Sequence, residues 1–165
     1  MRRTVIGVMG GTQVDQHAAE QAHELGRLIA TNGWVLLNGG RSSGVMDASA
    51  RGAQEAGGLT IGVLFDEDPT AASDYLDIVL PTGLGAGRNI INVLSSDVVV
   101  ACQGSGGTLS EIALAVRYGR PLVLLDFDPG ELFLRMAGSG PWIYANTAAE
   151  AVAHVREYLA VLGKQ

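Results

Sequence analysis

Short apolar runs alternate with longer stretches of helical periodicity along the whole chain. Seven runs have the length and composition of strands: residues 4–9, 34–37, 59–65, 77–80, 98–101, 121–125 and 142–144. They are mostly continuous rather than alternating, which is typical of strands covered by helices on both faces. The pattern therefore predicts an α/β fold, a Rossmann-like, doubly wound parallel sheet of about six to seven strands with right-handed crossovers and helices on both faces.

Between these runs, apolar positions recur at the spacing of a helix. The predicted helices cover residues 16–30, 45–56, 88–95, 108–118, 131–136 and 147–162. Asp15 is the expected cap of the first helix, and Asn32 with Gly33 closes it. Because no linker, repeat or low-complexity segment interrupts the pattern, and because 165 residues can bury a sizeable core, we expect residues 1–165 to form one domain.

The segment of residues 98–116, VVVACQGSGGTLSEIALAV, combines a buried strand, a glycine turn and a helix. Thr108 followed by Glu111 has the spacing of a capping box, so the helix is expected to begin at Thr108. Glycines let a ligand approach the backbone, and the free N–H groups and dipole of a helix N-terminus favour an anion, usually phosphate. Taken alone, the segment is equally consistent with an ordinary strand-to-helix turn.

Two more glycine turns follow predicted strands, at residues 10–12 and 39–44. In a doubly wound sheet, ligands bind beyond the carboxyl ends of the strands, so the three turns favour one shared phosphate site. The predicted ligand-binding residues are Gly10, Gly11, Thr12, Gly39, Gly40, Arg41, Ser42, Gly44, Met46, Arg88, Asn92, Gly104, Ser105, Gly106, Gly107 and Thr108.

Composition narrows the chemistry of this site. A formal charge of −6 argues against nucleic acid as a partner, although local N–H groups can still bind a small anion. Lys164 is the sole lysine and lies in the tail, which excludes a Walker A loop and argues against a pyridoxal-phosphate enzyme. Cys102 is the sole cysteine and the histidines are widely spaced, so we expect no disulfide and no protein-held metal.

The chain also lacks the signals of a membrane or secreted protein. The apolar run of residues 5–9 is too short for a signal core, and no apolar run approaches the roughly 20 residues that span a bilayer. We therefore expect a cytoplasmic protein with no membrane contact. The acidic segment of residues 66–74 is expected to be a solvated loop.

Known catalytic motifs fit the glycine turns poorly. None of the turns has the G-x-G-x-x-G pattern, and Asn38 stands where a dinucleotide enzyme carries a ribose-binding acid. Arg88 and Glu111 beside a phosphate site could instead support cleavage of an N-glycosidic bond. The arginine would hold phosphate or ribose, and the carboxylate would stabilise positive charge on the sugar or orient a water. A purely structural role of Glu111 as a helix cap is the alternative.

Several motifs resemble the LOG family, proteins long mislabelled as lysine decarboxylases. The resemblance is carried by residues 39–46, Arg88 and residues 104–111, and it extends from the first strand to about residue 125. It implies that Arg88 and Glu111 match the catalytic arginine and glutamate of the enzymatic branch. Members of that branch are nucleoside 5′-monophosphate phosphoribohydrolases that release cytokinin bases.

The chain departs from that enzymatic pattern at four positions. Gln103 replaces the motif proline, Ser105 a glycine, Ser110 the first glutamate, and Asn89 the lysine after the arginine. Residues 39–46, 87–96 and 111–115 are more similar to a second branch, the molybdenum-cofactor carrier proteins. This resemblance implies an anionic pterin bound without turnover, homodimers or homotetramers, and molybdoenzyme-related partners.

Two functions therefore stay open. The preferred one is a binding and carrier protein for an anionic phosphorylated ligand, either molybdenum cofactor (molybdopterin) or a related nucleotide, held as cargo and not as a catalytic cofactor. The alternative is a nucleotide phosphoribohydrolase in which Arg88 and Glu111 are catalytic. Helices 45–56 and 88–95 carry small or apolar residues and are expected to form the buried face of a dimer.

Overall fold

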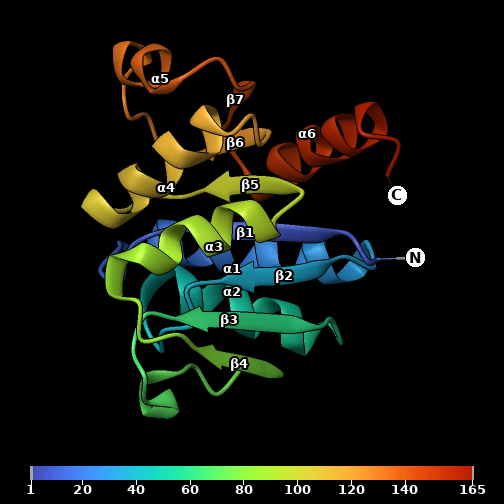
Figure 1. The fold of residues 1–165 in the computed structure, drawn as a ribbon. Helices are drawn as coiled ribbons and strands as arrows, with labels where there is room; N and C mark the ends of the chain where they lie inside the picture. Colours follow the sequence, from blue (N-terminus) through green and yellow to red (C-terminus); the bar gives the residue numbers. More distant parts are fainter. Residues whose placement is uncertain (1, 165) are drawn as a thin grey trace.

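The computed structural model describes residues 2–164 and contains a seven-stranded parallel sheet (Figure 1). The order of the strands is β4-β3-β2-β1-β5-β6-β7, so the topology reverses between β1 and β5. The strands are β1 Val5–Met9, β2 Val35–Asn38, β3 Thr60–Leu64, β4 Ile78–Pro81, β5 Val98–Ala101, β6 Leu122–Leu125 and β7 Trp142–Ala145. This architecture confirms the predicted Rossmann-like α/β fold.

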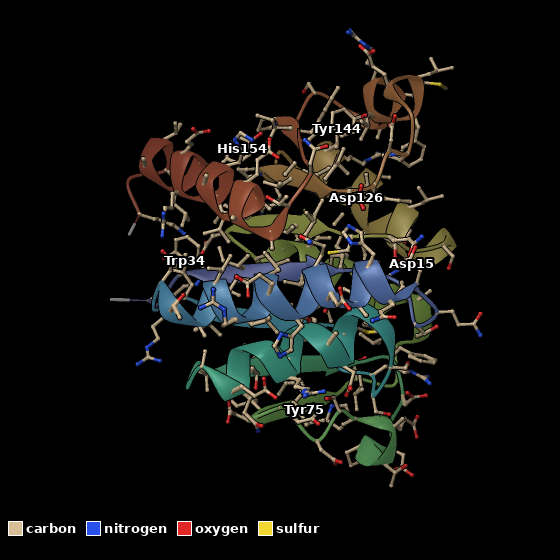
Figure 2. All side chains as sticks on the ribbon, turned by 180° about the vertical axis from the view of Figure 1, so that it is seen from behind. Asp15, Trp34, Tyr75, Asp126, Tyr144 and His154 are labelled. Carbon is tan, nitrogen blue, oxygen red and sulfur yellow. The ribbon has the colours of Figure 1, made fainter. Side chains whose placement is uncertain are left out.

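Helices cover both faces of the sheet. They are α1 Gln16–Thr31, α2 Gly44–Glu55, α3 Arg88–Ser95, α4 Gly106–Arg117, α5 Glu131–Ala137 and α6 Ala148–Val161, with short 3-10 helices η1 Pro69–Ala71 and η2 Gly85–Gly87. Figure 1 shows α3 and α4 in front of the sheet, and the reverse view in Figure 2 shows α1, α2 and α6 on the other side. Most predicted boundaries agree within one or two residues, the usual uncertainty of helix ends.

The central position of β5 in the sheet explains why its sequence is continuously apolar. Val98 and Val100 point into the core beneath α1, α2 and α6, whereas Val99 and Ala101 point into the core beneath α3, α4 and α5. Successive side chains of a strand lie on opposite faces, and both faces here are buried. Edge strand β4 is different, because Ile78 and Leu80 are 40% and 47% exposed. The expectation that every strand is covered on both faces is wrong for β4.

Helices α1 and α2 pack backbone to backbone within the chain. A side-chain carbon on Gly26 would lie 2.0 Å from the Ser49 carbonyl oxygen, and one on Gly52 would lie 1.9 Å from that of His23. Most small residues of α2 are therefore buried against α1. These residues of helix 45–56 are occupied within the chain, and the use of this helix in a dimer contact remains a prediction.

The parallel strands place all the loops that follow them at one edge of the sheet. In Figure 2, Asp15 after β1 and Asp126 after β6 lie at the same end of the molecule, and Trp34 before β2 lies at the other. Lys164 is far from the glycine turns, because it pairs with Asp97 at the start of β5. Within residues 2–164, no helix is long and apolar enough to cross a membrane.

Candidate anion-binding site

Three glycine loops meet by direct backbone contact beyond the ends of β1, β2 and β5. The Gly11 N–H donates to the Gln103 carbonyl (2.9 Å), and the Gly11 carbonyl accepts from the Val45 N–H (3.0 Å). A side-chain carbon would lie 2.1 Å from the Gly11 oxygen if added to Gly44, and 3.0 Å from the Gly11 nitrogen if added to Gly104. These glycines therefore allow the loops to pack against one another. The sequence had suggested only that they let a ligand approach the backbone.

A cavity of about 150 Å³ lies beside this junction, between the end of β1 and the starts of α3 and α4. Most of the predicted residues line it: Gly10, Gly11, Thr12, Gly39, Met46, Arg88, Ser105, Gly107, Thr108 and Glu111. The structure thus brings together residues from all three glycine turns and from α3.

The other predicted residues stand outside the wall of the cavity: Gly40, Arg41, Ser42, Gly44, Asn92, Gly104 and Gly106. Gly40 turns the chain with a φ of 78°, and its N–H is bonded to Asn38 Oδ1. Arg41 forms an ion pair with Asp66, and Asn92 is fully buried behind Glu111. A role of these residues in ligand binding remains a prediction.

Helix α4 begins earlier than the sequence predicted. Its first residue is Gly106 and its N-cap is Ser105, whose side chain makes no capping hydrogen bond. Thr108 and Glu111 therefore do not form the predicted capping box, and the Glu111 carboxylate instead accepts from Asn92 Nδ2 (3.0 Å). The helix therefore begins two residues earlier than predicted, within the glycine turn. The N–H groups of its first turn lack intrahelical partners and can meet an anion.

Arg88, the first residue of α3, supplies positive charge to the cavity. A side-chain carbon on Gly39 would lie 2.3 Å from Arg88 Nη1 and 2.7 Å from Met46 Sδ, so a larger residue there would force these two flexible side chains to shift. Arg88 Nε is buried without a hydrogen-bond partner. Burial lowers the pKa of Arg88, Glu111 opposes this effect and Arg41 adds to it, but an arginine stays protonated at neutral pH. A half-buried cation with an unpaired donor favours an anionic ligand.

Glu111 faces Arg88 across the cavity and is 6% exposed. Burial raises the pKa of Glu111 to about 7, against the opposing effects of the Asn92 hydrogen bond and the Arg88 charge. Glu111 is therefore partly protonated near neutral pH, and Arg88 dominates the charge of the cavity. Asn92 Oδ1, like Arg88 Nε, is buried without a partner.

A larger open hollow of about 1190 Å³ lies along α1 and α2. Four carboxylates line it, from Asp15, Glu20, Glu24 and Asp47, against the cationic Arg51 and the titratable His23. This surface disfavours an anion, so the smaller cavity is the better candidate. Its volume suits the phosphate end of a ligand rather than a whole cofactor, since drug-sized ligands usually occupy about 300–1,000 Å³.

Asn89 lines the cavity although it was not among the predicted site residues. Its Nδ2 donates to Ser110 Oγ (2.7 Å), and Ser110 Oγ donates to the Gly107 carbonyl (2.7 Å). The sequence had shown both residues as departures from the enzymatic motif. Their pairing joins α3 to α4 and was not detectable from spacing along the chain.

The structure offers little support for metal binding or for a reactive thiol. In the part of the chain that the structure describes, no group of three or more His, Cys, Asp or Glu side chains is placed to hold a metal ion. Burial raises the pKa of the Cys102 thiol to about 12, which disfavours the reactive thiolate.

The fold and the cavity define a Rossmann-like protein with a candidate anion site at its topological switch point. The chain belongs to the SLOG cluster4 family, whose match covers residues 3–152. This membership confirms the LOG-like resemblance seen in the motifs.

Comparison with known proteins separates two kinds of relative. The structure of the molybdenum cofactor binding protein from Rippkaea orientalis is 45% identical with a TM-score of 0.91, covering 96% of this chain and 99% of that one. The molybdenum cofactor carrier protein from Chlamydomonas reinhardtii is also 45% identical, with a TM-score of 0.88 and the same coverage. The cytokinin riboside 5′-monophosphate phosphoribohydrolase of Mycobacterium tuberculosis is 30% identical over 116 residues, 65% of this chain and 62% of that protein.

The raised pKa of Glu111 predicts a pH-dependent stability. The folded protein retains the Glu111 proton up to about pH 7, whereas an unfolded glutamate loses it near its ordinary value of 4.5. The stabilising contribution of this proton is fully present below pH 4.5 and is lost as the pH rises through about 7. Relative to Glu111→Gln, the wild type should therefore lose on the order of 2–3 kcal/mol between pH 5 and pH 8.

Urea unfolding of both proteins at the two pH values measures this difference. Glu20→Gln, a change of an exposed carboxylate on α1, is the matched control and should retain the wild-type pH dependence. An equal change in the free energy of unfolding of wild type and Glu111→Gln between the two pH values would contradict the prediction.

Proposed function

We propose that this protein binds and carries an anionic, phosphorylated ligand, and that molybdenum cofactor is its cargo. The observation that carries this proposal is the likeness to molybdenum cofactor binding and carrier proteins over nearly the full length of both chains. A related nucleotide is the second ligand of the same chemical type. We propose a cytoplasmic location for this activity.

The cavity offers suitable chemistry for the phosphate end of such a cargo. Arg88 would bind phosphate oxygens, and the first-turn N–H groups of Gly107 and Thr108 would add donors and a favourable dipole. The unpartnered Arg88 Nε supports this fit, because a bound anion supplies the missing acceptor. A pterin would extend out of the small cavity, whose residues would hold and orient the cargo.

A phosphoribohydrolase is the second candidate, because Arg88 and Glu111 do face the same cavity. Two features disfavour it. Glu111 is the one carboxylate among the lining residues and is partly neutral at pH 7, and the neutral Asn89–Ser110 pair stands where the enzymatic motif has charged residues. These features suit retention of a ligand better than cleavage of its glycosidic bond.

Incubation with AMP and with cytokinin ribotides, followed by assay of free base, separates the two functions. We expect no base release above the background of a protein-free control. Release by the wild type that is abolished by Glu111→Ala would establish the hydrolase.

We also propose a homodimer or homotetramer that delivers cargo to molybdoenzyme-related proteins. Helix α3 remains a candidate for the subunit contact, since Leu94 is 41% exposed, whereas α2 is largely occupied by α1. Light scattering at micromolar concentration should give a multiple of the 17.1 kDa chain mass. A monomeric mass would contradict this proposal.

Arg88→Ala should weaken cofactor binding far more than it weakens folding. Loss of a charge-assisted contact to a bound anion costs about 1.5–3 kcal/mol, which is roughly a tenfold or larger loss of affinity. Titration with molybdenum cofactor measures the binding, and urea unfolding measures the stability. Arg117→Ala, which removes an exposed arginine at the end of α4, should leave both unchanged. Equal affinity of the Arg88 and Arg117 variants for the cofactor would show that Arg88 does not contribute to binding.

A further inference from the structure

One aromatic ring connects two arginines at the edge of the cavity. Phe65 follows β3 directly, and its ring centroid lies 4.0 Å from Arg41 Cζ and 5.9 Å from Arg88 Cζ. Both distances are within the roughly 6 Å range of a cation–π contact. Phe65 therefore links Arg88, which lines the cavity, to Arg41, which does not.

Arg41 is held by a partner that a ligand can replace. Its Nη2 lies 3.0 Å from Asp66 Oδ2 and 3.3 Å from Oδ1, and the two side chains are 29% and 30% exposed. Ion pairs open to solvent contribute little to stability, so an exchange of partner requires little free energy. The planar fork of arginine donors matches phosphate oxygens as well as it matches a carboxylate.

The two arginines concentrate positive charge in an otherwise acidic protein. Their guanidinium carbons lie within about 10 Å of each other, close to the Debye length at physiological ionic strength. The nearby carboxylates are Asp66 and Glu111, and Glu111 is partly protonated at neutral pH. A ligand group with one negative charge can pair with Arg88 while Arg41 stays on Asp66, whereas a second negative charge supplies an acceptor that can replace Asp66 at Arg41.

We propose that Arg41 is a second anion-binding side chain, which exchanges Asp66 for a ligand group that carries two negative charges at Arg88. Phe65 is then a positioning residue that keeps the Arg41 guanidinium near the cavity, and Asp66 is an internal competitor of the ligand. This inference rests on the proposed function and adds a specificity to it. The site selects a phosphomonoester dianion over a singly charged phosphodiester.

Phenyl phosphate and methyl phenyl phosphate test this selectivity at pH 7, where the first is mostly a dianion and the second a monoanion. By calorimetric titration, Arg41→Gln should lower the affinity for phenyl phosphate by about three- to tenfold, the effect of losing one charge-assisted contact. Its affinity for methyl phenyl phosphate should stay within about twofold of the wild type. An equal loss for both probes, or no loss for either, overturns the inference.

A double-mutant cycle tests the exchange between Asp66 and the ligand. Asp66→Asn should strengthen binding of phenyl phosphate by about two- to fivefold, the range expected from release of a partly exposed ion pair. The same change made in the Arg41→Gln protein should have no effect, since no arginine remains to be released. A gain that persists without Arg41 would show that Asp66 acts on the ligand only through its own charge, and would overturn the exchange.

Phe65 variants test the positioning role. Phe65→Leu should lower phenyl phosphate affinity toward the Arg41→Gln value, and Phe65→Tyr, which retains the aromatic ring, should restore it. Unfolding curves show whether each variant is folded. The Asp66 cycle leaves the ring intact and decides the inference even if Phe65→Leu does not fold.

Failure of this inference is distinguishable from failure of the proposed function. Wild-type protein that binds neither probe nor molybdenum cofactor overturns both. If wild type and Arg41→Gln bind phenyl phosphate with the same affinity, only the role of Arg41 is overturned and the proposed function stands.

Discussion

The backbone contact between the loops of β1, β2 and β5 is the constraint on which the site depends. Gly11 donates to one neighbouring loop and accepts from the other. A side-chain carbon on Gly44 would overlap the Gly11 carbonyl oxygen, and one on Gly104 would overlap Thr108 Oγ1 and press on the Gly11 nitrogen. Interiors are packed to the density of crystals, so such a junction cannot yield by small adjustments. The junction holds the start of α4 next to the start of α2, and the cavity lies beside it, between the end of β1 and the starts of α3 and α4.

The cavity departs from the usual rules for stable interiors. It contains a half-buried guanidinium with an unpaired donor and a buried carboxyl with a raised pKa, and the Asn92 amide oxygen behind it is buried without a hydrogen-bond donor. Each of these features costs stability in the free protein. Polar groups that a fold leaves unpaired in this way are typical of binding sites, because a ligand supplies the missing partners.

Only a few residues of this cavity distinguish the carrier proposal from the hydrolase alternative. Arg88 and Glu111 line the same cavity, yet Glu111 has a raised pKa and is bound to Asn92. Asn89 and Ser110 form an uncharged bridge between the two helices beside them. One fold can serve proteins of different function, and the chain differs from the enzymatic motif here in the charge of a few side chains.

The sequence by itself determined the alternation of strands and helices, the parallel sheet and the edge of the sheet at which the glycine loops gather. These features depend on local periodicity and on glycine turns after apolar runs, which are readable along the chain. It also identified Arg88 and Glu111 through the family motifs. It misplaced the start of α4, because a capping-box spacing at Thr108 and Glu111 competes with a tertiary hydrogen bond to Asn92.

Only the tertiary structure decided which of the predicted residues share the cavity. Asn89 and Ser110 meet across two helices, Gly39 makes room for Arg88, and Phe65 lies beneath two arginines from other segments. Such contacts join residues that are distant in the chain and depend on the packing of whole elements. No local pattern encodes them, because the distances that matter are set by the sheet and by the three loops locked at its edge.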